Sequence, residues 1–143
     1  MRLRVQRLHE AATLPTHAHE GDAGYDLYAT EAAELAPGER AIVGTGIAIE
    51  VSNGHAALVL PRSGTAAKHG ISVVNAPGLI DSGYRGEIRV ILINTDRSEP
   101  FSVAVGDRIA QLVLVRVETP PVEEVSSLNE SARGDGGFGS SGR

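Results

Sequence analysis

The chain has 143 residues, a formal net charge of −5 at pH 7 and no cysteine. This length fits one domain, since domains usually span about 100–200 residues. The lack of cysteine excludes a disulfide scaffold, a Cys-based zinc site and a cysteine nucleophile. The acidic balance argues against a general nucleic-acid binder, which needs a basic face. Neither a membrane span nor the apolar stretch of a secretory signal is found. We therefore expect a cytoplasmic protein that binds neither nucleic acid nor membranes.

Short apolar runs, either alternating with polar residues or β-branched, recur along most of the chain. Runs of this kind between turn residues are typical of β-strands. In chain order, the expected strands lie at residues 3–5, 47–51, 55–60, 88–93, 101–105 and 109–117. A helix is expected only at residues 65–69, about one turn, ended by Gly70. The pattern predicts an all-β barrel or sandwich.

The composition changes after Pro120-Pro121. The remaining segment is acidic at first and then rich in Ser and Gly, so it holds too few apolar residues to order itself. We therefore divide the chain into a β domain over residues 1–121 and a flexible C-terminal arm over residues 122–143. The arm has about 22 residues, and at ~3.3–3.6 Å per residue it can reach roughly 70 Å, onto another subunit.

Two clusters near predicted strand ends combine polar residues with glycine. Asp26 follows an Asp-Ala-Gly-Tyr run at a strand start, where a carboxylate can hold a metal through water; the alternative is a solvated turn residue. Arg62, Ser63 and Gly64 lie between strand 55–60 and the short helix. An Arg, a hydroxyl and a helix start suit a phosphate group. The alternative there is an ordinary helix cap with Ser63 as N-cap.

Residues 75–87 carry the most informative cluster, and they are predicted to form a hairpin with polar groups at its mouth. Asp81 lies at the tip, where a carboxylate can act on a water molecule. Tyr84 offers a flat face to a sugar or a base. The alternative is a surface hairpin that binds nothing.

Residues 133–142 fit the spacing G-x-G-x-x-G, but no strand precedes them and no helix follows, so a dinucleotide fold is excluded. Glycines allow backbone N–H groups to wrap an anion, and Phe138 can stack on a base. The alternative is a disordered tail without a function.

Taken in order, these clusters resemble the motifs of the trimeric deoxyuridine triphosphatase (dUTPase) family. The resemblance runs from Asp22 to the end of the chain, over residues 23–27, 61–64, 75–87, 106–112 and 133–142. It implies a jelly-roll-like β-barrel that assembles as a homotrimer. It further implies three shared active sites, each with motifs one, two and four from one subunit, the third motif from a second and the arm from the third.

The resemblance also implies the reaction, in which dUTP and water give dUMP and pyrophosphate with Mg²⁺ as cofactor. This reaction limits uracil incorporation into DNA and supplies dUMP for dTTP synthesis. Asp81 would be the general base, and Asp26 would hold Mg²⁺ through water. The residues implied to bind the phosphates are Arg62, Ser63, Gly64, Gln111, Arg133, Ser140 and Ser141. Those implied to bind uracil and deoxyribose are Asn75, Gly78, Leu79, Ile80, Tyr84, Arg89 and Phe138.

Two alternatives remain within the same fold. A dCTP deaminase acts on C4 of the base, and that family differs in the segment corresponding to residues 75–87 and lacks this glycine-rich tail. A nucleotide-binding module without catalysis would lack Asp81 or the arm. Both features are present here, so the sequence favours the triphosphatase.

Overall fold

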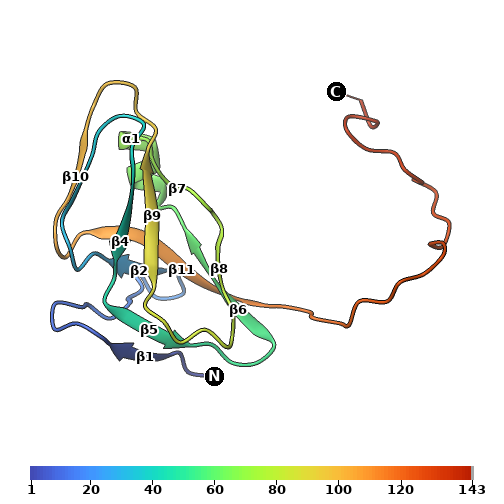
Figure 1. Cartoon of the computed structure of the whole chain (residues 1–143), viewed down its shortest axis with the longest axis horizontal. Coiled ribbons are helices and arrows are strands. Elements are labelled where there is room, and N and C mark those ends of the chain that lie inside the picture. Colours follow the sequence, from blue (N-terminus) through green and yellow to red (C-terminus); the bar gives the residue numbers. More distant parts are fainter. Residues whose placement is uncertain (143) are drawn as a thin grey trace.

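The computed structural model describes residues 1–142 of the chain (Figure 1). The described part is rich in strands and contains one short helix, which confirms the all-β class. No helix in it is long and apolar enough to cross a membrane. In chain order the elements are β1 (Arg4–Arg7), β2 (Tyr25–Tyr28), β3 (Ala33–Leu35), β4 (Arg40–Gly44), β5 (Ile47–Glu50), β6 (His55–Leu60), α1 (Ser63–His69), β7 (Ile71–Val73), β8 (Gly78–Ile80), β9 (Arg89–Asn94), β10 (Phe101–Val103) and β11 (Arg108–Arg116).

The strands form four antiparallel sheets around one core. The largest has the order β2-β11-β6-β8, and the second has the order β4-β9-β7, while β1 pairs with β5 and β3 with β10. Over residues 1–142 these sheets do not join into a closed barrel. The expectation of a β fold is therefore confirmed at the level of the class.

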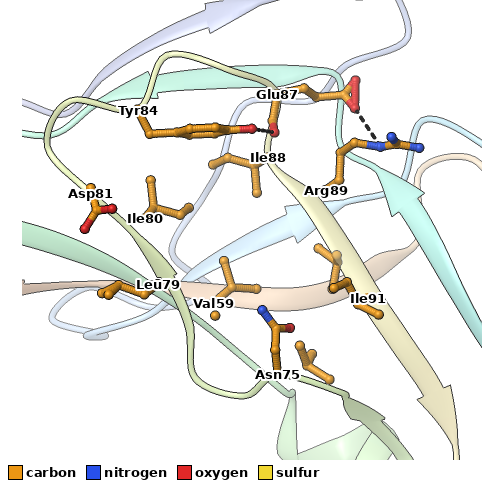
Figure 2. A pocket seen from close by; sticks show the side chains of 13 residues that line it. Val59, Asn75, Leu79, Ile80, Asp81, Tyr84, Glu87, Ile88, Arg89 and Ile91 are labelled. Atoms are coloured by element: carbon orange, nitrogen blue, oxygen red, sulfur yellow. Dashed lines mark hydrogen bonds and ion pairs between the residues drawn. The ribbon is translucent and has the colours of Figure 1, made fainter.

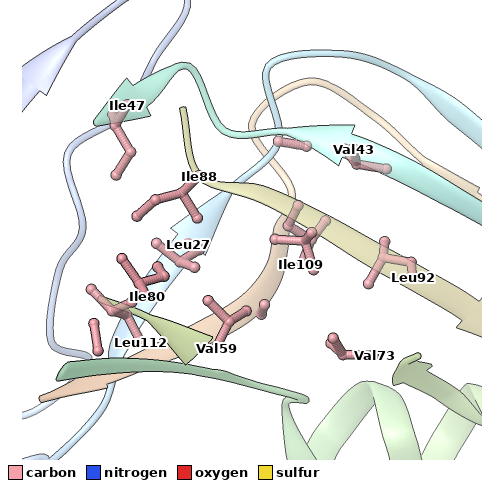
Figure 3. Close-up of a cluster of buried hydrophobic side chains, with 14 of the residues drawn as sticks. Leu27, Val43, Ile47, Val59, Val73, Ile80, Ile88, Leu92, Ile109 and Leu112 are labelled. Atoms are coloured by element: carbon pink, nitrogen blue, oxygen red, sulfur yellow. The ribbon is translucent and has the colours of Figure 1, made fainter. Parts of the chain in front are cut away.

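The core lies between the two larger sheets, where the inward side chains of their strands meet (Figure 3). Alternation along β9 explains the packing, because Val90 and Leu92 are buried while Arg89 faces out. On β11, Leu112 is fully buried against them. Burying an aliphatic side chain of this size stabilises the fold by about 1.5–3 kcal/mol. This core holds the site-bearing strands in place.

Long apolar runs predicted their strands well. The expected strand 55–60 is β6, and 88–93 and 109–117 match β9 and β11 to within a residue at each end. The helix ends at Gly70 as expected, since this residue has a left-handed φ of 66°. A strand start was expected at Asp26, which lies in β2. The sequence missed β3, β4, β7 and β8, which have three to five residues each. Runs so short carry little periodicity.

The predicted hairpin over residues 75–87 is wrong. Strand β8 pairs with β6, with Leu79 opposite Leu58. Strand β9 instead pairs with β4 and β7. The turn residues do mark a reversal of the chain, but the segment carries it from one sheet to the next. We refer to residues 81–88 as the inter-sheet turn.

After β11 the chain leaves the body and extends away from it (Figure 1). Residues 117–142 contain no strand or helix. The apolar side chains of residues 122–142 are exposed, with Val122 at 100% and Leu128 at 87% of full accessibility.

Candidate active site

A cavity of about 220 Å³ lies between β8 and β9 (Figure 2). We name it the turn cavity, because the inter-sheet turn forms part of its rim. Buried side chains of the core form its floor, namely Val59, Val73, Ile80, Ile88 and Val90. Its lining brings together all the residues predicted for uracil and deoxyribose apart from Phe138, and with them the predicted base: Asn75, Gly78, Leu79, Ile80, Asp81, Tyr84 and Arg89.

Tyr84 is held on the rim by contacts within its own turn. Its backbone N–H donates to the carbonyl of Asp81 at 3.1 Å, and its hydroxyl donates to the carbonyl of Glu87 at 2.9 Å. A Cβ at Gly86 would lie 2.5 Å from the Tyr84 hydroxyl oxygen, so the ring lies directly over that glycine. The ring is 46% exposed. Tyr84 and the carboxylate of Asp81 thus lie on the same cavity (Figure 2).

The opposite end of the turn cavity carries an amide next to backbone. A Cβ added at Gly78 would lie 3.4 Å from Nδ2 of Asn75, so this side chain packs against β8. An amide side chain offers both a donor and an acceptor. The Asn75 amide and the adjacent backbone of β8 together offer the donors and acceptors needed to recognise the edge of a planar ring. Arg89 on the other wall pairs with Glu87 at 3.6 Å.

A second, polar cavity of about 390 Å³ joins three distant parts of the sequence. We name it the arginine cavity. Its lining consists of Ala18, Asp22, Ala23, Gly24, Asp26, Arg62, Ser63, Gly64 and Gln111. Strand register explains the convergence, because Gln111 of β11 lies opposite Asp26 of β2 on one side and Leu60 of β6 on the other. Motifs one, two and four thus meet at one place.

Two guanidinium groups hold the carboxylate of Asp26. Arg62 Nε lies 3.2 Å from Oδ1 and Arg108 Nε lies 3.5 Å from Oδ2, and the Asp26 side chain is only 12% exposed. The Tyr28 hydroxyl, and after it the Asp26 carboxylate, raise the pKa of Arg108 above its ordinary value. Arg62 and Arg108 bring two positive charges close to Asp26, and Asp22 adds a second carboxylate to the lining. The guanidinium groups are the part of this site that suits an anionic ligand.

Gln111 and Ser63 complete the arginine cavity. The Gln111 amide donates to the carbonyl of Pro61 at 2.9 Å, and a Cβ at Gly24 would lie 2.6 Å from its Oε1. A side chain at position 24 would therefore displace the end of the Gln111 side chain. The alternative role of Ser63 as N-cap is wrong, because Arg62 is the N-cap and no side chain caps α1. The Ser63 side chain is therefore not committed to the helix.

The carboxylates of the arginine cavity could serve a magnesium ion only if phosphates and waters supplied its other ligands. Residues 1–142 contain no group of three or more His, Asp or Glu side chains able to hold a metal. Mg²⁺ usually binds through one or two carboxylates and substrate phosphates, and keeps several waters. Asp26, whose oxygens already face Arg62 and Arg108, suits contact with such waters.

The predicted arm residues lie at neither cavity. Arg133 Nε donates to the carbonyl of Gly136 at 2.6 Å, within the arm itself. Phe138 is fully exposed and has a positive φ of 52°. Ser140 and Ser141 are exposed as well. One chain thus carries the predicted site in three separate parts, which are the two cavities and the arm.

Nearly the whole chain, including these three parts, is similar to proteins of one known family. The family model described as dUTPase matches residues 10–142. The chain belongs to the dUTPase family. One dUTPase relative is the deoxyuridine 5'-triphosphate nucleotidohydrolase of Thermobifida fusca, 57% identical over 142 residues, which cover 99% of this chain and 79% of the relative. Another is that of Corynebacterium glutamicum, 55% identical over 141 residues, which cover 99% of this chain and 95% of the relative.

Solved dUTPase structures have the same fold. A variant of the dUTPase of Staphylococcus bacteriophage 80alpha, with dUpNHpp, superposes with a TM-score of 0.93 at 30% identity, covering 99% of both chains. A dUTPase variant from phage phi11 of S. aureus superposes at 0.83 with 28% identity, covering 91% of this chain and 100% of that one. The phi11 protein is described with a structural Mg(II) ion.

Sequence reasoning missed two groups of residues at the dUTPase cavities. On the apolar floor of the turn cavity, only Ile80 was a predicted site residue. Val59, Ile88 and Val90 were expected as strand interior and Val73 was not predicted at all, since nothing local marks a core residue that also faces a cavity. Arg108 was part of the fourth motif but had no predicted role. The signal that identifies it is the register of β11 with β2, which places Arg108 opposite Tyr28 and near Asp26.

Proposed function

We propose that this chain hydrolyses dUTP to dUMP and pyrophosphate in the presence of Mg²⁺. The observation that carries the proposal is the sorting of the motif residues into two cavities of complementary chemistry. The turn cavity has an apolar floor with an amide and a carboxylate at its rim, which suits a base and a sugar. The arginine cavity has two guanidinium groups close to its one well-buried carboxylate, which suits phosphates.

Uracil selection is assigned to Asn75 and the backbone of β8, residues Gly78, Leu79 and Ile80. Cytosine presents a donor where uracil presents an acceptor, so one polar group would be covered without a partner. A mismatch of this kind can reject an analogue by about 10⁴–10⁵. Tyr84 packs against the deoxyribose and leaves no room for a 2′-hydroxyl. Arg89 supports the same side of the substrate.

Binding of the α- and β-phosphates is assigned to Arg62, Ser63, Gly64 and Gln111. Arg62 must turn from Asp26 toward the phosphates, and Arg108 remains to balance the carboxylate. Asp26 then holds Mg²⁺ through water. When bound, Mg²⁺ neutralises part of the phosphate charge. The fixed side-chain donors stabilise the charge that develops in the transition state.

Asp81 is the proposed general base. Its carboxylate accepts a proton from a water molecule, the water oxygen bonds to the α-phosphorus, and the bond to the bridging oxygen breaks in line. Pyrophosphate leaves with that bond's electron pair. General-base catalysis by a positioned carboxylate typically contributes about 10²–10⁴ in rate.

The complete site requires other copies of the chain, and we propose a homotrimer with three shared sites. The turn cavity and the arginine cavity have no lining residue in common. The outer face of β4-β9-β7 exposes apolar side chains, with Ile42 at 54% and neighbouring Val74 at 48% of full accessibility. These side chains suit contact with a neighbouring copy.

The arm, residues 122–143, is proposed to close a site on another subunit, apart from the β domain of residues 1–121. Arg133, Ser140 and Ser141 bind the γ-phosphate, and Phe138 stacks over the uracil. Closure excludes water and strengthens each polar contact. The exposure of the apolar side chains of residues 122–142 supports this role, because these side chains are not packed on the body.

Pyrophosphate release from dUTP, dCTP, dTTP and UTP, with Mg²⁺ and again with chelator, tests the reaction. We expect fast release from dUTP alone, and only with Mg²⁺. Ammonia released from dCTP would instead place the chain with the deaminases. Bound nucleotide without any product would make it a binding module and would contradict the role of Asp81.

Co-expression of two inactive variants tests the shared site. One variant carries Asp81→Asn and the other lacks residues 133–143. If base and arm come from different subunits, about one quarter of the sites in a random trimer hold both intact parts. Activity no greater than that of the separate variants would contradict sharing, since every chain then lacks one part of its own site.

A further inference from the structure

The inter-sheet turn carries both the proposed base, Asp81, and the proposed sugar gate, Tyr84. Ser82 and Gly83 lie between them, and a Cβ at Gly83 would meet no atom within 4 Å. A glycine in open space gives the backbone much freedom. Since a displacement of about 1 Å at a reacting group can cost 10²-fold in rate, something must restrain this turn.

Arg85 supplies the restraint. Its Nη1 donates to the carbonyl of Ser82 at 2.6 Å and to the carbonyl of Tyr84 at 3.0 Å. These two bonds span Gly83 from one side, while the bond from Tyr84 N–H to the Asp81 carbonyl closes the turn at 3.1 Å. One guanidinium nitrogen thus ties together the carbonyls on both sides of the glycine.

The same guanidinium also faces the body. Arg85 Nη2 lies 3.8 Å from Oε1 of Glu50, and Oε2 of Glu50 lies 2.7 Å from Nη1 of Arg4. Glu50 and Arg4 are opposite each other on the paired strands β5 and β1. The turn is thereby connected to a sheet that contributes nothing to the lining of either site cavity.

Arg85 acts from behind the turn. It lines a separate cavity with Arg4 and Glu50 and is absent from the lining of the turn cavity. We propose that Arg85 is a positioning residue. It fixes the positions of both the Asp81 carboxylate and the Tyr84 ring without touching the substrate. This inference rests on the proposed function of the site.

A positioning role and a purely structural role of Arg85 predict different kinetic results. A residue needed only for folding would lower the melting temperature and leave the ratio of kcat/KM for dUTP to that for UTP unchanged. A residue that positions both Asp81 and Tyr84 must change kcat and this ratio together, because both side chains move with one turn.

The experiment compares the full-length wild type with Arg85→Ala, Arg85→Lys and Arg97→Ala. Arg97 is a matched control, since its side chain makes no hydrogen bond or ion pair with the rest of residues 1–142. For Arg85→Ala we expect kcat on dUTP to fall by roughly 10–100-fold, and the dUTP-to-UTP ratio to fall with it. Affinity for dUpNHpp should change little. Arg85→Lys should rescue part of both losses, and Arg97→Ala should behave as wild type.

Wild-type kcat and an unchanged dUTP-to-UTP ratio in Arg85→Ala would overturn the proposal. If Arg85→Ala does not fold, Arg85→Lys and Glu50→Gln are measured instead. Wild-type kcat and a wild-type dUTP-to-UTP ratio in both variants would then overturn the proposal. An inactive wild-type protein would refute the proposed function and this inference together. An active wild type with an unaffected Arg85→Ala refutes the role of Arg85 alone.

Discussion

The β body and the C-terminal arm differ in what orders their side chains. In the body, Leu92 and Leu112 are fully buried, and register places Asp26 and Gln111 side by side. In the arm, Leu128 and Phe138 face solvent and the contacts are local turns. Ordering a residue costs about 1–2 kcal/mol in backbone entropy. The body meets this cost by burial, whereas the exposed side chains of the arm bury little that could meet it.

This difference indicates that the body and the arm have different roles in the proposed reaction. The two cavities are formed by packed strands and by the loops and turns that join them. The arm contributes its Arg, Ser and Phe side chains only when it closes. Selectivity and base catalysis are therefore assigned to the body, and retention of the γ-phosphate to the arm.

The largest effect is expected from Asp81→Asn in the body. The amide has nearly the same shape but cannot accept the proton, so turnover should fall by about 10²–10⁴. Affinity for dUpNHpp should stay near that of the wild type, as measured by titration calorimetry. Near-normal pyrophosphate release would remove Asp81 as the base.

Deletion of residues 133–143 tests the arm by itself. The melting temperature should be unchanged, because residues 133–142 form hydrogen bonds only with other residues of the arm. Pyrophosphate release from dUTP should fall on the order of 10²–10³, comparable with the loss of a transition-state donor. Full activity in the shortened chain would show that the arm takes no part.

A pair of Leu→Ala variants measures the stability difference between the regions. Leu92→Ala should lower the free energy of unfolding by about 2–5 kcal/mol, since it opens a hole in the core. Leu128→Ala should stay within about 0.5 kcal/mol of the wild type, as for an exposed site. Urea unfolding followed by circular dichroism gives both values. A loss at Leu128 like that at Leu92 would mean that the arm is packed in solution.

Tyr84→Ala gives the smallest expected effect and sharpens the assignment of selectivity to the body. Without the ring, the 2′-hydroxyl of UTP fits, so turnover of UTP relative to dUTP should rise on the order of tenfold. Competition assays with both nucleotides measure the ratio. Tyr28→Ala, which removes a tyrosine ring outside the lining of the turn cavity, provides the comparison. An unchanged ratio in Tyr84→Ala would contradict the sugar gate.

Much of the site was predictable because its motifs are local. Residues 75–87 and 106–112 each carry their chemistry in one short stretch, and β6, β9 and β11 follow from long apolar runs. The N-cap role weighed for Ser63 and the hairpin over residues 75–87 were wrong. The identity of an N-cap depends on the backbone geometry of one or two residues, and a hairpin depends on which strand pairs with which. Local sequence patterns specify neither.

The sequence by itself determined the β class, the short helix ended by Gly70 and the inventory of polar residues, since these depend on side chains close together in the chain. Only the tertiary structure decided that β8 pairs with β6, that Asp26 lies between Arg62 and Arg108, and that Arg85 supports the turn of Asp81 and Tyr84. These contacts join residues on different strands or depend on the path of one turn. Strand pairing is selected by burial of the whole core, so no single segment encodes it.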